Sequence, residues 1–178
     1  LALNALGDDV TIVMPYYQVL ADQLNLPTVT EQQTLFTEGQ VYHFDIRHML
    51  WHGIPVYFID SPVHFMREGL YANAFEGYED NGERFSFFSG AVLQTLKAID
   101  TRADVIHCHD WHTAMLPFLL TYEQSGFFKE TKTVFTIHNA AFQGVHKLET
   151  IPFLRHHPHI LAQVHGGYIN MLQSGIEF

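Results

Sequence analysis

The chain has 178 residues, of which 47% are apolar and 14% aromatic, which is enough to build a hydrophobic core in one domain or slightly more. Its 19 acidic and 9 basic residues give a formal net charge of -10, which repels phosphate backbones and anionic headgroups and argues against nucleic acid and membranes as partners. The single cysteine, Cys108, excludes an intrachain disulfide and a thiolate zinc cage and is consistent with a reducing, cytoplasmic setting.

The first predicted elements are the end of a helix and a buried strand. The segment "LALNALG" (1–7) has apolar residues at helical spacing and ends on Gly7, a residue that favours helix C-termini. The run "DDVTIVMP" (8–15) is typical of a short buried strand. Because the chain begins without a methionine, inside a predicted helix, we expect it to be a piece of a longer protein.

An antiparallel hairpin is predicted over residues 41–60. Apolar and polar residues alternate on both sides of His52-Gly53, which we interpret as the turn. The polar segment before it is only weakly patterned. Residues 61–80 carry several aromatic side chains with little periodicity, so we expect a long ordered loop of the kind that often carries function.

Helical and strand patterns alternate from residue 80 onward. The segment 80–100 places apolar residues three and four apart after Asp80 or Asn81 as N-cap, which predicts a helix with one buried face. The later predictions are a strand "ADVIHCH" (103–109), a helix "MLPFLLTYEQ" (115–124), a strand "TKTVFTIHN" (131–139), and, in "GGYINMLQSGIEF" (166–178), a helix followed by an incomplete strand. This order predicts an α/β fold with a Rossmann-like, mainly parallel sheet and helices on both faces.

Polar side chains gather where two of the predicted strands end. They are His109, Asp110 and His112 after the first strand, and His138, Asn139 and Gln143 after the second. Ligands of open parallel sheets bind outside the carboxyl ends of the strands, so the two clusters together indicate a binding site. Either cluster alone is explained equally well as a cap that satisfies backbone groups.

The run His107 to His112, "HCHDWH", raises the alternative of a metal site. Alternate residues of a strand share a face, so His107 and His109 could act as ligands, with Asp110 and His112 completing the set. The order is close to the H-x-H-x-D-H of binuclear metallohydrolases, but Asp110 directly follows His109, which changes the side chains that converge. We therefore expect no metal and keep a metal-dependent hydrolase only as an alternative. Cys108 is expected to act as a small apolar residue on the packed side of the strand.

Six segments carry a resemblance to a known family. They are "DVTIVMPYY" (9–17), "GIPVYFID" (53–60), "YEDNGERFSFFSGAVLQTL" (78–96), "ADVIHCHDWHTAMLPFLL" (103–120), "TKTVFTIHNAAFQG" (131–144) and "GGYINMLQSGIEF" (166–178). In this order they resemble the bacterial glycogen synthases and plant starch synthases, which are retaining glucosyltransferases of the GT-B type. The resemblance implies that residues 1–178 are a partial N-terminal catalytic domain that lacks its first strand, and that the C-terminal nucleotide-binding domain is absent.

The same resemblance implies a reaction and its residues. The family transfers glucose from a nucleotide sugar, usually ADP-glucose in bacteria, to the nonreducing end of an α-1,4-glucan, with retention and without a cofactor. The resemblance implies Asp110 and His138 as catalytic residues beside the transferred glucose. It implies substrate-binding positions at Tyr78, Asp80, Asn81, His112 and Asn139; Gln143 is added as part of the second cluster.

The chain also departs from the family. The family's lysine-containing K-x-G-G-L loop precedes the start of this chain, and the C-terminal domain supplies cations for the diphosphate, so we expect the isolated chain to be inactive. Gly90 and Gln173 stand where many members have arginine and lysine. Sheet edges exposed by the missing strand make a second copy of the chain a candidate partner. A noncatalytic glucan-binding or assembly module, with the aromatic residues of 65–78 stacking on sugar, is kept as an alternative.

Overall fold

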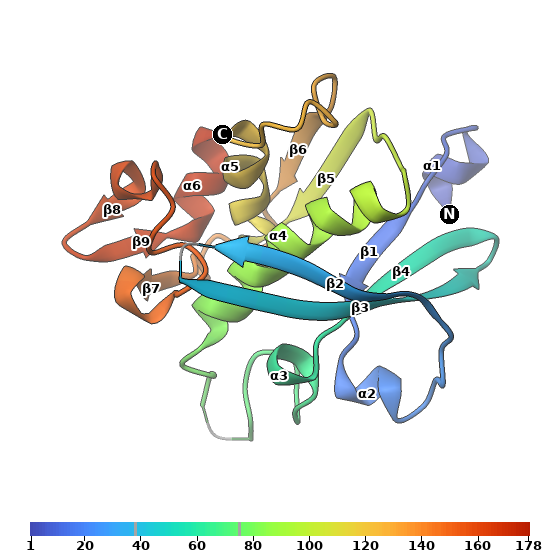
Figure 1. Cartoon of the computed structure of the whole chain (residues 1–178), viewed down its shortest axis with the longest axis horizontal. Helices are drawn as coiled ribbons and strands as arrows, with labels where there is room; N and C mark the ends of the chain where they lie inside the picture. Colours follow the sequence, from blue (N-terminus) through green and yellow to red (C-terminus); the bar gives the residue numbers. More distant parts are fainter. Residues whose placement is uncertain (38, 75) are drawn as a thin grey trace. The chain divides into compact units, whose positions relative to one another are not determined.

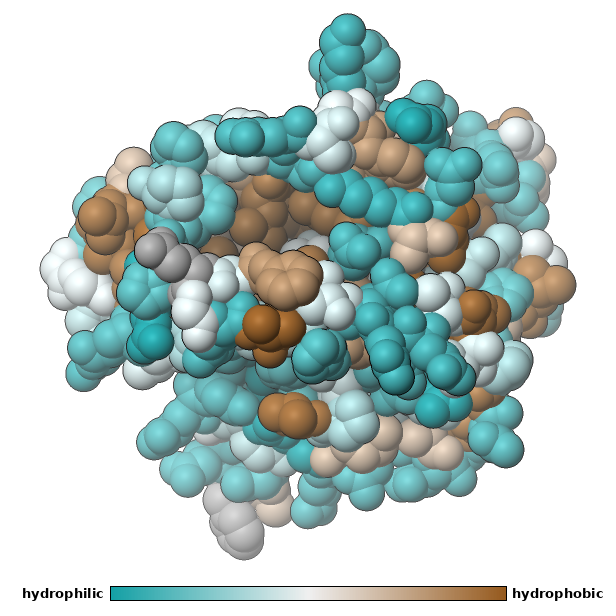
Figure 2. Space-filling view, viewed as in Figure 1, coloured by the Kyte–Doolittle hydropathy of each residue, from teal (hydrophilic) through white to brown (hydrophobic). Residues whose placement is uncertain are grey.

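The computed structural model describes residues 1–37, 39–74 and 76–178 (Figure 1). These residues form two compact units: unit 1 comprises residues 1–34 and 42–78, and unit 2 comprises residues 35–41 and 79–178. The predicted α/β class is confirmed, with parallel and antiparallel strand pairs in mixed, open sheets. Hydrophilic residues cover most of the face seen in Figure 2, and hydrophobic residues appear there as separate patches. Within the described ranges, no helix has the length and apolar character needed to span a bilayer.

Unit 1 is built on a four-stranded sheet of order β1-β4-β3-β2. Its elements are α1 (Ala2–Ala5), β1 (Ile12–Pro15), α2 (Gln18–Ala21), β4 (Ile54–Asp60), α3 (Pro62–Phe65) and the larger parts of β2 (Thr28–Thr37) and β3 (Gln40–Trp51). The ends of β2 and β3 within residues 35–41 belong to unit 2. β1 pairs with β4 in parallel, whereas β3 and β4 form the predicted antiparallel hairpin. His52 and Gly53 both have positive φ (50° and 81°), as a two-residue turn between twisted strands requires. β2 was not predicted, because its sequence TVTEQQTLFT is largely polar.

The aromatic loop of residues 61–78 is only partly available for ligand contact. The ring of Phe65 is fully buried and packs edge-on against Tyr17 at 5.8 Å, so it cannot stack on a sugar. Tyr78 lies under the guanidinium of Arg67 at 4.8 Å. Tyr71 is 46% exposed, and Phe75 lies outside the described residues. The predicted sugar-stacking surface of residues 65–78 therefore cannot include Phe65.

Unit 2 contains the predicted alternation of helices and strands. Its elements are α4 (Asn81–Ala98), β5 (Val105–His109), η1 (Trp111–Thr113), α5 (Met115–Thr121), β6 (Lys132–Thr136), β7 (Val145–Lys147), η2 (Leu148–Thr150), η3 (Ile160–Gln163), β8 (Val164–His165), β9 (Tyr168–Asn170) and α6 (Met171–Glu177). β5 and β6 lie side by side as a parallel pair (Figure 1). The three short strands form a second, antiparallel sheet of order β7-β9-β8.

Helix α4 is the core of unit 2 and is buried on nearly all sides, not on the single face predicted. The buried residues include three phenylalanines, Phe85, Phe87 and Phe88. The polar residues Ser86 and Ser89 are buried as well. The two serines remain compatible with burial because each hydroxyl donates to a helix carbonyl four residues earlier, at 2.7 and 2.9 Å. α5 and η1 pack against α4, and α6 packs against α5 and η1, so α4 lacks the solvent face that periodicity alone predicts.

The closing segment folds in the opposite order to the prediction. β9 comes first, and α6 follows directly. Asn170 is the N-cap that separates them, because its side-chain oxygen accepts a hydrogen bond from the backbone N–H of Gln173 at 3.1 Å. The pair Gly166-Gly167, with φ of 60° and 86°, forms the turn that lets β9 pair back with β8.

Candidate functional site

The site is built at the carboxyl ends of β5 and β6. The two strands are in parallel register, with His109 beside Thr136. Alternation along β5 turns Cys108 into the packed interior, where burial raises the pKa of its thiol to about 12, although the nearby Thr113 side chain opposes the shift. His107 and His109 lie on the opposite, exposed face. The expectation that Cys108 serves as a buried, small residue is confirmed.

Asp110 joins the two predicted clusters. Its backbone N–H donates to the carbonyl of Thr136 at 2.9 Å, which continues the β5–β6 pairing by one residue. Its carboxylate oxygen Oδ1 accepts hydrogen bonds from the backbone N–H of His138 at 2.7 Å and of Asn139 at 3.4 Å. The Asn139 side-chain oxygen in turn accepts from the N–H of Ala141 at 3.0 Å. The turn after β6 thus forms a cradle of main-chain donors around the Asp110 carboxylate.

Three histidine rings lie next to this carboxylate. His107 stacks on His109 with ring centroids 4.2 Å apart, and Nδ1 of His109 lies 3.1 Å from Nε2 of His138, within hydrogen-bond distance. Partial burial lowers the pKa of His109, the neighbouring histidines lower it further, and Asp110 opposes them. The lowered pKa of His109 favours the uncharged form of its imidazole. Within 1–37, 39–74 and 76–178, no three His, Cys, Asp or Glu side chains are grouped as a metal ion would require.

His112 lies behind Asp110 among aromatic rings. It stands edge-on to Phe85 at 4.8 Å and lies against Trp111 at 4.1 Å. Burial lowers the pKa of His112 to about 4; the Asp110 carboxylate acts in the opposite direction and the Arg84 guanidinium in the same one. The imidazole is accordingly neutral at pH 7 and supplies shape and hydrogen bonding to the site, not positive charge.

A hollow of about 400 Å³ opens beside this cluster. Two of the predicted residues, Asn81 and Gln143, lie on its wall, together with Trp111, Ala141, Phe142, Gly144, Val145 and His146. The side-chain oxygen of Gln143 accepts from the Asn170 amide at 2.6 Å, which fixes its direction. Phe142, which lies beside the hollow, is 67% exposed. We did not predict it as a site residue, although a phenylalanine in the polar loop "AAFQG" could have indicated one.

Gly144 allows Trp111 to form the floor of this hollow. Gly144 has φ of 62°, and a Cβ at this position would lie 2.6 Å from Cε3 of the Trp111 ring. Its carbonyl accepts from the N–H of Met171 at 3.1 Å, which ties the loop after β6 to the start of α6. Glycine is the residue that permits both the left-handed turn and this close approach.

The two remaining predicted residues lie on either side of the point in the sequence where unit 1 ends and unit 2 continues. Asp80 is the N-cap of α4 by position, and its carbonyl accepts from the N–H of Arg84 at 2.9 Å. Tyr78 belongs to unit 1, where its hydroxyl donates to the carbonyl of Glu68. Six of the eight predicted residues, Asn81, Asp110, His112, His138, Asn139 and Gln143, therefore lie around the β5–β6 ends or the neighbouring hollow of unit 2.

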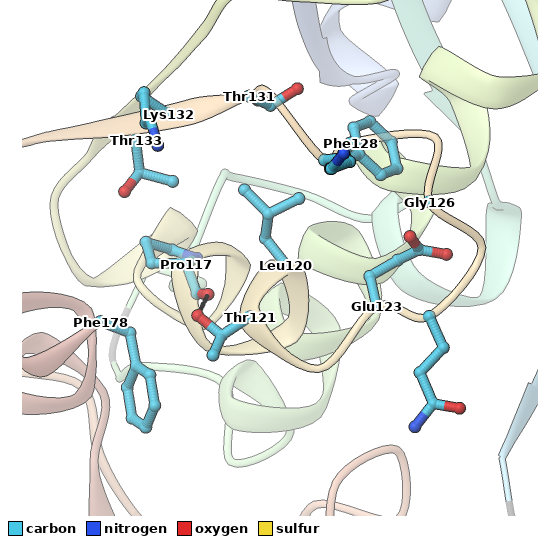
Figure 3. A pocket seen from close by; sticks show the side chains of 12 residues that line it. Pro117, Leu120, Thr121, Glu123, Gly126, Phe128, Thr131, Lys132, Thr133 and Phe178 are labelled. Atoms are coloured by element: carbon cyan, nitrogen blue, oxygen red, sulfur yellow. Dashed lines mark hydrogen bonds between the residues drawn. The ribbon is translucent and has the colours of Figure 1, made fainter.

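A second hollow in unit 2 contains none of the predicted residues. It measures about 450 Å³ and is lined by α5, by the segment 123–133 and by Phe178 (Figure 3). Glu123, one of its charged groups, forms an ion pair with Lys97 at 2.5 Å. Pro117 and Leu120 contribute apolar surface to it, and its titratable side chains are Glu123, Lys129 and Lys132.

Comparison with known proteins agrees with this geometry. Residues 1–178 match the family model described as the starch synthase catalytic domain. The chain is 39% identical over 184 residues to the glycogen synthase of Photobacterium profundum, covering 99% of this chain and 36% of that protein. It is 40% identical over 147 residues to glycogen synthase 2 of Geobacter sulfurreducens, covering 81% of this chain and 30% of that protein.

Among solved structures, the chain resembles the catalytic domain of starch synthase IV from Arabidopsis thaliana bound to ADP and acarbose. The TM-score is 0.75 and the identity 27%, over 99% of this chain and 38% of that one. The chain spans roughly a third of the length of the relatives it matches. The match of all 178 residues to the family model, with the identity to glycogen synthases and the shared GT-B fold, establishes that this chain belongs to the starch synthase and glycogen synthase family of glycosyltransferases.

Proposed function

We propose that the chain is part of the N-terminal catalytic domain of a cytoplasmic glycogen synthase that transfers glucose from ADP-glucose to the nonreducing end of an α-1,4-glucan with retention. The rest of the site, including the nucleotide-binding domain, would lie in the part of the enzyme that this chain does not span. The starch synthase IV structure carries ADP and acarbose, a nucleotide and an oligosaccharide, which supports these substrate classes. A second copy of the chain, bound through exposed sheet edges, stays a proposed partner.

The observation that most supports the proposal is the held carboxylate of Asp110. Breaking the bond to a diphosphate builds positive charge on the sugar ring, as in glycoside hydrolysis, and a carboxylate beside the ring favours that charge. The main-chain N–H groups of His138 and Asn139 fix the direction of this carboxylate before substrate arrives. In this proposal His138 contacts the transferred glucose.

The other proposed residues position the sugar. The neutral His112 packs behind Asp110, whereas Asn81 and Gln143 offer amide groups at the hollow and hold sugar hydroxyls. Tyr78, Asp80 and Asn139 are proposed to lie along the same substrate path. No metal is invoked, because cationic side chains of the complete enzyme can neutralise the diphosphate.

The test is a chimeric enzyme. This chain replaces the 184-residue aligned segment of the Photobacterium profundum glycogen synthase, and incorporation of labelled glucose from ADP-glucose into glycogen is measured. We expect incorporation by the chimera and a loss of kcat on the order of a hundredfold for Asp110→Asn, the scale of removing one charge-stabilising group. Asp100→Asn, at the exposed end of α4, is the matched control. A folded chimera without transfer, or equal losses for both variants, would reject the proposal.

A noncatalytic glucan-binding role is favoured by one observation, the exposed ring of Phe142 beside the hollow. Aromatic rings of this kind stack on sugar faces. Affinity electrophoresis in gels containing glycogen measures such binding on the chain itself. Retardation that Phe142→Ala abolishes supports this role, whereas equal mobility with and without glycogen counts against it.

A further inference from the structure

The backbone of Asp110 adopts a conformation that few residues other than glycine tolerate. Its φ is 56° and its ψ is -178°, so the chain turns sharply between β5 and η1. Such a conformation costs free energy and persists only when the surrounding contacts over-determine it. Because the direction of the Asp110 carboxylate depends on this backbone, the groups that hold the turn also determine where the carboxylate lies.

One side chain contacts the peptide groups on both sides of the turn. The hydroxyl oxygen of Thr113 accepts a hydrogen bond from the backbone N–H of His109 at 2.6 Å. The same hydroxyl has two carbonyl acceptors within reach, that of His109 at 2.9 Å and that of Asp110 at 3.3 Å. The backbone N–H of Thr113 also donates to the Asp110 carbonyl at 3.2 Å.

We propose that Thr113 is a positioning residue whose hydroxyl locks the strained turn at Asp110, so that the carboxylate meets the main-chain donors of His138 and Asn139. Thr113 acts through Asp110. The consequence for sugar transfer rests on the proposed function, but the hydrogen-bond geometry does not. A hydroxyl is suited to the task because it accepts and donates at the same time. Valine has the same shape but can do neither, whereas serine retains both.

The test is made on the 178-residue chain by NMR, without any sugar. The reporter is the backbone amide proton of His138, which donates to the Asp110 carboxylate at 2.7 Å. In Thr113→Val we expect this proton to move upfield and its exchange with solvent to accelerate by on the order of tenfold, the factor of one lost hydrogen bond. In Thr113→Ser we expect the shift and the exchange rate of the parent chain.

A matched control separates this effect from the general loss of a threonine hydroxyl. Thr121→Val removes a hydroxyl that donates to the carbonyl of Pro117 at 3.0 Å within α5. It should leave the His138 amide unchanged. A His138 amide that is the same in Thr113→Val as in Thr113→Ser, or that changes equally in Thr121→Val, would overturn the proposal.

A second measurement covers the case in which Thr113→Val folds poorly. Asp110→Gly removes the side chain that makes the turn unfavourable, because glycine adopts this φ readily. If Thr113 acts by holding the strained turn, Thr113→Val should lower the urea midpoint less in the Asp110→Gly background than in the parent chain. Equal decreases in both backgrounds would reject the role. Failure of the chimera to transfer glucose would reject the proposed function and leave these results standing.

Discussion

His112 makes the stability of the chain depend on acid. Burial lowers its folded-state pKa to about 4, below the ordinary value of 6.5 that applies in the unfolded chain. Between these values the unfolded state binds more protons, so stability is complete above about pH 6.5 and is lost as the pH falls towards about 4. His146 and His157, whose pKa values are also lowered mainly by burial, act in the same direction.

The acid effect is measured as urea midpoints between about pH 7 and about pH 5. We expect the midpoint of the parent chain to fall over this range and that of His112→Asn to fall less. His52→Asn, in the exposed hairpin turn, is the control because asparagine tolerates the left-handed backbone there. Parallel pH profiles for the parent chain and His112→Asn would contradict the assignment.

Cys108 provides a second prediction at the scale of one residue. Its thiol is 1% exposed, and burial raises its pKa to about 12, so almost no thiolate is present at pH 7. We expect Ellman's reagent to leave the folded chain unlabelled and to react with one thiol per chain in denaturing urea. Cys108→Ala gives the blank. Fast labelling of the native chain would show that β5 does not bury this face.

At the scale of elements, α4 explains one departure from the family. The resemblance to the family leads us to expect an arginine at position 90, but a Cβ on Gly90 would already lie 2.4 Å from Cζ of Phe153. The Phe153 ring is itself buried and meets Phe87 edge-on at 6.4 Å, so it cannot retreat freely. In this chain a phenylalanine from the segment after η2 fills the space that a side chain at position 90 would need.

This packing predicts that replacing Gly90 with alanine destabilises the chain, although alanine has the higher helix propensity. In an open helix Gly→Ala stabilises by about 1 kcal/mol, but overpacking of a core costs about 1–3 kcal/mol. We expect Gly90→Ala to lower the free energy of unfolding by roughly 1 kcal/mol in the parent chain. The same change should be neutral or stabilising in the Phe153→Leu background, measured by urea unfolding. An identical effect in both backgrounds would show that the two residues do not compete for space.

The sequence predicted the elements whose local signals agree with their packing. β5 and β6 were found because apolar alternation ends at polar residues in both, and the hairpin was found because alternation continues on both sides of His52-Gly53. The parallel register that brings Asp110 to the His138 loop also follows from the general rule for strand ends. The predicted grouping of these residues in space was therefore accessible before the structure.

Other features depend on contacts that sequence periodicity does not encode. β2 is polar and half-exposed, so only its pairing with β3 defines it as a strand. The order of β9 and α6 was wrong because the apolar run 168–172 fits both structures, and the Asn170 cap that decides between them was overlooked. The role of Thr113 depends on the backbone conformation of Asp110, and an aspartate in the sequence does not predict that conformation.

At the scale of the whole molecule, the chain spans roughly a third of the length of its relatives. Unit 2 holds the carboxylate, the histidines and the hollow, and the described residues that line this hollow include no arginine or lysine to neutralise a diphosphate. A net charge of -10 further disfavours a free anionic donor. Under the proposed function, the chain on its own therefore offers one side of a transfer site.

We accordingly predict that the isolated chain does not transfer glucose. Incubation with labelled ADP-glucose and glycogen should give incorporation no greater than the background without protein. The complete Photobacterium profundum enzyme, assayed in parallel, shows that the reagents are active. Incorporation above background by the purified chain would mean that the site is complete without further domains.

The cradle of Asp110 is made of main chain, because the N–H groups of residues 138 and 139 bind its carboxylate. Any amino acid except proline supplies those donors. The side chains at the two positions are thus released from holding the carboxylate. Under the proposed function, substitutions there would change which sugar hydroxyls are recognised while the charge beside the ring stays in place, so that recognition and charge stabilisation would evolve separately within two consecutive residues.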